Sequence, residues 1–187
     1  MPRLETARLL LRRWQKRDVD DLFEYARHPE VGPSAAWLPH PNRQHSLLVL
    51  VKVFMQEDGQ WAIEHKEQRK VIGAISLHRD AKRTVPNTRA LGYSLSHDFW
   101  GQGLMSEAAP VVVAYGFEHM GLDLISCYHF EGNERSRRII EKCGFTFEGI
   151  LRHCTSVGKS IHQDYCYSMT REEYFARHPQ DNQTDQP

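Results

Sequence analysis

The segment between Leu91 and Met105 limits the possible folds more than any other part of the sequence. A short apolar strand, Leu91-Gly92-Tyr93-Ser94-Leu95, leads through a loop into Trp100-Gly101-Gln102-Gly103-Leu104-Met105, where a long helix begins. Glycines let a backbone approach a ligand closely, and the free N–H groups of a helix start favour an anion such as pyrophosphate. The same two glycines also suit a tight turn that binds nothing, so a second motif has to decide.

Two common phosphate-binding motifs fit this segment poorly. A P-loop needs a glycine, four residues and then Gly-Lys-Ser/Thr, which the sequence does not contain. A dinucleotide-binding turn needs a third glycine, and position 106 is Ser106. The acidic residue that should end the next strand, Asp123, instead stands at its start.

A second motif, Asn133-Glu134-Arg135-Ser136, follows the next apolar strand and precedes Gly144-Phe145 by eleven residues. Alone it indicates a helix capped by Asn133, with an exposed serine one turn later. It follows the glycine loop, one strand further along the chain. The two motifs in this order favour a ligand site more than either motif does alone.

The apolar patterns predict an α+β fold with a mixed central sheet. Helices are expected first, including one over residues 44–57, then antiparallel strands, then strand, helix, strand, helix and a final hairpin. We expect one domain over residues 1–178, because this length fits a single core. Residues 179–187 contain no large apolar side chain and are expected to be disordered.

The composition excludes several classes of partner and points to the cytoplasm. Lys plus Arg number 24 and Asp plus Glu number 24, so no net charge attracts nucleic acid or an anionic membrane. The start of the chain has no secretory signal, and no apolar run is long enough to cross a bilayer. The four cysteines form no C-x-x-C pair, which favours a reducing compartment and buried thiols. Zinc binding by His153, Cys154, His162 and Cys166 is disfavoured by their spacing, and we expect no metal.

Taken together, the motifs resemble the GNAT (GCN5-related N-acetyltransferase) superfamily, and in particular its RimJ/RimL-like branch. The resemblance spans nearly the whole chain, and no single stretch is specific. It rests on residues 6–12 (opening strand), 91–93 (central strand), 100–108 (pyrophosphate loop), 133–136 with 141–145 (pantetheine-side helix) and 148–152 (following strand).

The resemblance implies a GNAT-like fold that binds acetyl-CoA between two splayed central strands. These strands are expected to separate after about Leu95 and to leave backbone groups free for pantetheine. The residues expected to bind the cofactor are Ser94, Leu95, Trp100, Gly101, Gln102, Gly103, Leu104, Met105, Asn133 and Ser136. Ser136 would also donate a proton to the departing thiolate, with direct attack by a neutral amine and no covalent enzyme intermediate.

The general base is where the sequence departs from its relatives. Ala90 stands where a glutamate is common before the Gly-Tyr strand, and Thr155 stands where RimL-like relatives have the proposed base. His153, two residues from Thr155, is our candidate because its imidazole titrates near neutral pH. Its alternative is a partly exposed strand histidine, and Glu131 and His97 are weaker candidates.

Four further expectations remain open at this stage. The loop Trp37-Leu38-Pro39-His40-Pro41 either floors an amine pocket or packs onto the core. Glu107 is either a buried structural carboxylate or a charge at a helix start. The acceptor is a protein N-terminus or a small amine, with a non-catalytic acyl-CoA sensor as the alternative function, and a homodimer is plausible because a mixed sheet leaves strand edges.

Overall fold

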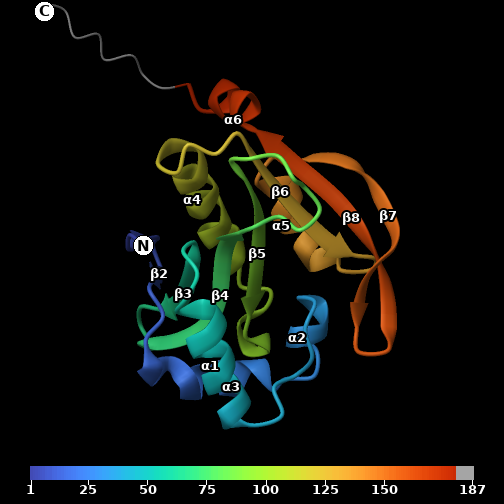
Figure 1. The fold of residues 1–187 in the computed structure, drawn as a ribbon. Coiled ribbons are helices and arrows are strands. Elements are labelled where there is room, and N and C mark those ends of the chain that lie inside the picture. Colours follow the sequence, from blue (N-terminus) through green and yellow to red (C-terminus); the bar gives the residue numbers. More distant parts are fainter. Residues whose placement is uncertain (180–187) are drawn as a thin grey trace, which may run out of the picture.

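The computed structural model describes residues 1–179, and its centre is one eight-stranded mixed sheet. The strand order is β1-β2-β3-β4-β5-β6-β8-β7 (Figure 1). Only β5 and β6 run parallel, and every other neighbouring pair is antiparallel. The strands are β1 (Leu4–Glu5), β2 (Leu9–Arg12), β3 (Gln60–His65), β4 (Lys70–His78), β5 (Thr88–Leu95), β6 (Leu124–Phe130), β7 (Thr146–Val157) and β8 (Ser160–Thr170).

Helices cover both faces of this sheet, so the predicted α+β class is confirmed as the GNAT fold. One face carries α4 (Leu104–Glu118), α5 (Glu134–Lys142) and α6 (Arg171–Arg177), and the other carries α1 (Val19–Ala26) and α3 (Arg43–Val49). A short helix, α2 (Val31–Ser34), lies near the end of β5. Among these described helices, none has the length and apolar character needed to span a bilayer.

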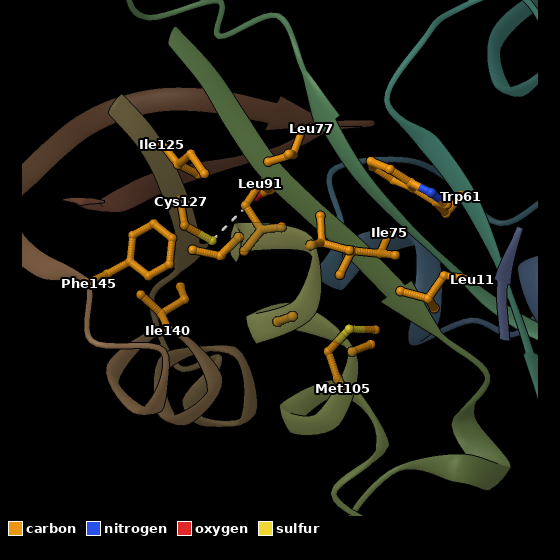
Figure 2. Close-up of a cluster of buried hydrophobic side chains, with 14 of the residues drawn as sticks. Leu11, Trp61, Ile75, Leu77, Leu91, Met105, Ile125, Cys127, Ile140 and Phe145 are labelled. Atoms are coloured by element: carbon orange, nitrogen blue, oxygen red, sulfur yellow. Dashed lines mark hydrogen bonds between the residues drawn. The ribbon is translucent and has the colours of Figure 1, made fainter. Parts of the chain in front are cut away.

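The larger core lies between the sheet and α4. Trp61, Ile75 and Leu77 of β3 and β4 are fully buried, and Leu91 of β5 is nearly so. Figure 2 shows these side chains gathered above α4, with Ile140 of α5 and Phe145 closing one side. Burying a side chain of this kind stabilises the fold by roughly 1.5–3 kcal/mol, so this layer fixes where α4 begins relative to the central strands.

Several element predictions need correction. The helix expected over residues 44–57 is regular only from Arg43 to Val49 and then widens into a π-helical turn, Leu50–Phe54 (η2). Helix α6 was not expected, although Thr170 and Glu173 form a capping box at its start. The tail predicted to be disordered lies, from residue 180 onward, outside the described residues. The boundary of the domain at 178 stays a prediction.

The two central strands separate earlier than the sequence suggested. The parallel pairing of β5 with β6 ends at Leu91 and Cys127, not after about Leu95. From there β5 stays paired with β4 as far as Leu95, while β6 stays paired with β8 as far as Phe130. Each strand therefore follows its own outer neighbour, and the sheet opens into a fork. At the base of the fork the Cys127 thiol donates to the Leu91 carbonyl over 3.3 Å (Figure 2).

Candidate active site

A cavity of about 470 Å³ fills the fork between β5 and β6. Its walls come from residues 90–95 of β5, residues 128–130 of β6, the start of α4 and one face of α5. Beyond Leu91, the edge of β5 that turned toward β6 has no strand to pair with. Its free backbone N–H and C=O groups can donate hydrogen bonds to a ligand and accept them from it. The Trp100 indole N–H already donates to one of them, the Leu95 carbonyl, over 2.9 Å.

The glycine loop places the N-terminus of α4 at this cavity. Gly101 and Gly103 have φ of 76° and 75°, a left-handed conformation that glycine adopts without strain. Gly103 is the N-cap of α4, and no side chain caps the helix there. The first N–H groups of α4 are thus left for an anion.

Most residues expected to bind the cofactor are brought together at this cavity. Nine of the ten expected residues line it: Ser94, Leu95, Trp100, Gly101, Gly103, Leu104, Met105, Asn133 and Ser136. Gln102 is exposed and does not line it, since its amide donates to the Asp98 carbonyl and its own carbonyl accepts from Arg8. Leu104 and Met105 have their side chains in the core, so only their backbones can serve a ligand.

Helix α5 adds a row of cations that the sequence analysis missed. Arg135, Arg138 and Lys142 line the cavity, and none of the three forms an ion pair within the described part of the chain. Their spacing of three and four residues puts them on one helix face, which is the signal that could have identified them. The Arg135 guanidinium lies 3.8 Å from the centre of the Trp100 ring. This row supplies the positive charge that phosphate groups require.

Ser136 meets a tyrosine hydroxyl inside the fork. Its side chain is buried, and the hydroxyls of Ser136 and Tyr93 lie 2.7 Å apart. Asn133 accepts from the Ser136 N–H over 3.2 Å, which fixes the first turn of α5, and its amide donates to the Ser34 carbonyl. Burial raises the pKa of Tyr93 well above its usual value. Tyr93 therefore stays protonated and can donate to the serine oxygen, leaving the serine proton available to an acceptor in the cavity.

A second cavity, of about 780 Å³, adjoins the first and shares Ala35, His78 and residues 92–94 with it. The loop over residues 37–41 lines it, and Trp37 packs against the smaller core, as one of the two expectations for this loop had it. The role of the loop as the floor of an amine pocket stays a prediction. His40 is buried and its Nδ1 lies 2.7 Å from the Ser46 hydroxyl. Burial, and then the charge of His45, lowers the pKa of His40 to about 4.

His78 lines both cavities. Its Nδ1 is 3.1 Å from the Ser76 hydroxyl, and its ring lies over Gly92, where a Cβ would come within 2.8 Å of the imidazole. A larger residue at position 92 would therefore displace the His78 ring. Burial lowers the pKa of His78, with charges nearby acting in both directions, so the imidazole is neutral at pH 7.

The structure places the predicted base apart from this site. His153 is exposed and does not line either cavity. It lies where β7 shifts register against β8, between Leu151 and Thr155, and has a φ of 53°. The two-residue alternation on which the prediction relied is interrupted there. Thr155 does line the fork cavity, whereas Glu131 is exposed and His97 lies outside both cavities.

One group of possible metal ligands occurs among the described residues. Donor atoms of His28, Glu30 and His97 lie within 4.8 Å of one another. The two imidazole rings stack at 4.3 Å with an angle of 18° between their planes. Their lone pairs therefore lie in two nearly parallel planes that are offset from one another, so they do not both point at one ion, which a metal site requires.

Glu107 is a structural carboxylate at the start of α4. It accepts from the Thr6 hydroxyl, and from the N–H and Nε of Arg8 at 2.8 Å each. Burial by itself raises the pKa of Glu107, but these hydrogen bonds outweigh it and the pKa lies below its usual value. The ionised side chain therefore ties the N-terminal strands to the helix that carries the glycine loop.

The eight-stranded mixed sheet that opens into a fork, with helices on both faces, is the fold of the GNAT acyltransferases. The sequence profile of the acetyltransferase (GNAT) domain matches residues 8–146. The uncharacterized N-acetyltransferase YoaA of Bacillus subtilis (strain 168) is 29% identical over 175 residues, covering 91% of this chain and 97% of the relative. The chain thus belongs to the GNAT acetyltransferase family and is an acyltransferase.

Solved structures show the same fold. A GNAT-family acetyltransferase from Bacillus anthracis superposes with a TM-score of 0.81 at 22% identity, covering 92% of this chain and 100% of that one. The Microcin C7 self immunity acetyltransferase MccE, in complex with acetyl-CoA and AMP, has a TM-score of 0.74 at 21% identity, covering 88% of this chain and 93% of that one.

Proposed function

We propose that this protein transfers the acetyl group of acetyl-CoA to a primary amine by direct attack in a ternary complex. The observation that carries the proposal is the cavity in the fork, where unpaired strand edge, uncapped helix start and cationic row come together. These match the three parts of CoA, namely an amide-bearing arm, a pyrophosphate and a further phosphate. The acetyl-CoA complex of MccE, which has the same fold, supports this choice of donor.

In the proposed reaction a neutral amine nitrogen attacks the thioester carbonyl carbon, and the C–S bond then breaks. Ser136 donates its proton to the departing thiolate and is resupplied by Tyr93. The acceptor, an ammonium ion in solution, loses two protons overall, and one of them replaces the proton taken by sulfur. Holding both reactants in the adjoining cavities contributes several kcal/mol of the rate enhancement.

We propose His78 as the group that accepts the first proton from the acceptor. It is a neutral imidazole, and it lies where the donor cavity meets the second cavity. The proposal for His153 stays a prediction from sequence. Its exposure on β7 and its absence from both cavity walls favour His78.

Four finer assignments accompany this function. We propose membership of the RimJ/RimL-like branch on the sequence motifs alone, and a cytoplasmic location on the free state of all four cysteines. A homodimer is proposed from the exposed apolar side chains of Phe147, Ile150 and Leu151 on the edge strand β7. The acceptor is taken to be a small amine or a protein N-terminus, without nucleic acid, a membrane or a metal.

The test is release of CoA thiol from acetyl-CoA in the presence of a panel of amines, both free and at peptide N-termini. The proposal predicts thiol release only with an amine present, and an N-acetylated product by mass spectrometry. If acetyl-CoA binds but no amine releases thiol, the protein is an acyl-CoA sensor, which is the alternative function.

A further inference from the structure

A lysine side chain occupies a carboxylate site in the wall of the fork cavity. Lys82, in the loop between β4 and β5, directs its ammonium group to Asp164 of β8, with 2.6 Å between Nζ and Oδ2. The same nitrogen lies 3.9 Å from the centre of the Tyr128 ring, over its face. Lys82, Tyr128 and Asp164 all line the cavity. A carboxylate and an aromatic face together are a site for an alkylammonium ion.

The Asp164 carboxylate is buried with one oxygen unused. Its side chain is 2% exposed, and Oδ2 accepts from both Lys82 and the Thr155 hydroxyl, the latter at 2.8 Å. Oδ1 is buried and has no hydrogen-bond partner among the described residues. A buried carboxylate oxygen left without a donor is unfavourable, so the site has capacity for a further N–H group that residues 1–179 do not supply.

The strand register puts this site on the acceptor side of the sheet. His78 pairs with Ala90, Ala90 with Ser126, and Ser126 with Ser168, so these four residues point to one face. Residues two or four positions further along share that face, which adds Tyr128 and Asp164. Tyr93 and Cys127, one position out of step, point to the opposite face. The proposed base His78 and the carboxylate of Asp164 therefore lie on the same face of the sheet.

A second buried carboxylate holds the components in position. Asp80 accepts from the Tyr128 hydroxyl at 2.7 Å and from the Lys82 backbone N–H at 2.8 Å. It thereby orients the ring and begins the turn that brings the lysine in. The lysine ammonium is the more movable component, since it lies at the end of a long side chain that belongs to a surface loop and is 24% exposed. The carboxylate and the ring are fixed, and the cation is the replaceable part.

Resting on the proposed function, we infer that Asp164 and Tyr128 form a binding subsite for an aliphatic ammonium group of the acceptor, and that Lys82 fills this subsite until the acceptor displaces it. Lys82 is then an internal competitor of the substrate. The acceptor class is an amine on an alkyl chain, as in a lysine side chain, because that is the group the subsite already holds.

The test uses n-butylammonium, which has the carbon chain and charge of the lysine side chain, without acetyl-CoA. Lys82→Ala should lower the melting temperature, and butylammonium should restore at least half of that loss with saturation. Neutral 1-butanol should not restore the melting temperature of Lys82→Ala. In the double variant Lys82→Ala, Asp164→Asn, butylammonium should not restore it either. Lys70→Ala, which removes a lysine paired with Glu24 at the surface, is the matched control and should show no saturable rescue. Equal responses of Lys82→Ala and Lys70→Ala, or of butanol and butylammonium, would overturn the inference.

A second variant covers the case in which Lys82→Ala does not fold. Lys82→Met keeps the volume of the side chain and removes only its charge. With an acceptor found in the amine screen, it should lower the KM for the amine at least threefold and leave CoA affinity unchanged. A KM that stays the same or rises contradicts the inference. Rescue by butylammonium without any thiol release would instead retain the subsite and refute acetyl transfer.

Discussion

At the scale of single residues, the site consists of groups whose roles depend on burial, which the sequence does not reveal. Ser136 lies in the wall of the cavity and follows the helix cap Asn133, while its roles as cofactor ligand and proton donor stay predictions from its motif. His78 and Asp164 were missed, because they reach the site through pairings with strands far away in the chain. The interpretation of His153 assumed unbroken strand alternation, and the irregularity of β7 breaks it.

The first prediction separates the two candidate bases. His78→Gln should lower kcat/KM about a hundredfold at pH 7, whereas His153→Gln, at an exposed position, should have little effect. Burial lowers the pKa of His78 below 6.5, so its basic form persists into mild acid. In the pH–rate profile, the step that belongs to the enzyme should therefore lie below about pH 6.5. A second step should follow the pKa of the acceptor amine. If His153→Gln, and not His78→Gln, removes the step that belongs to the enzyme, His153 is the base.

The second prediction concerns the acid. Ser136→Ala should lower kcat about ten- to a thousandfold while leaving CoA affinity nearly unchanged, because it removes a proton donor and little binding surface. Tyr93→Phe should give a smaller loss, since the serine keeps its own proton. Steady-state kinetics with an amine of known pKa measure both. An unaltered kcat in Ser136→Ala means that the serine only shapes the start of α5.

At the scale of elements, the sequence indicated most helices and strands, because their apolar spacing reflects local geometry. It missed α6, even though its capping box was visible in the sequence, and it placed the opening of the fork several residues too late. The point where β5 and β6 separate depends on the pairing of β5 with β4 and of β6 with β8. The local sequence pattern of a strand does not reveal these pairings. The cationic face of α5 was visible in the spacing of its side chains and went unused.

The third prediction tests that face of α5. Arg138→Gln should weaken CoA binding several-fold, and the loss should shrink at high salt, because the residue contributes charge toward phosphate. Arg137→Gln on the same helix is the control. Arg137 is paired with Glu134 and Glu141 and does not line the cavity, so CoA affinity should stay the same. Titration calorimetry would decide, and equal effects of the two variants would show that the cationic face has no specific role.

At the scale of the whole molecule, composition and element order gave the fold class correctly. The relation between the two cavities could not be predicted, because it arises where α2, the loop over residues 37–41 and the central strands meet.

The buried histidines couple this arrangement to pH. A histidine whose pKa is depressed in the folded protein adds stability above its unfolded pKa, and this stability is lost as the pH falls.

The fourth prediction follows from His40, whose folded pKa is about 4 against an ordinary value of 6.5. Between these two values the unfolded chain takes up a proton that the folded protein does not. The melting temperature should therefore fall as the pH is lowered from 6.5 to 4. His40→Gln should reduce the slope in this window, with thermal unfolding as the readout. A slope identical to that of the wild-type protein would show that His40 is not held neutral.

The most direct test of the account is a titration with CoA that compares two glycine variants of α4. Gly103→Asp puts a negative charge at the helix start in the fork, and Gly121→Asp puts one just beyond the other end of the helix. Both glycines have positive φ, of 75° and 66°, and neither has a heavy atom closer than 3.8 Å to an added Cβ. We predict that CoA raises the melting temperature of the wild-type protein and of Gly121→Asp with an affinity on the order of micromolar, and that Gly103→Asp abolishes the shift. A wild-type protein that saturating CoA does not stabilise, or a Gly103→Asp variant that binds CoA as well as Gly121→Asp, would contradict the assignment of the fork as the acetyl-CoA site.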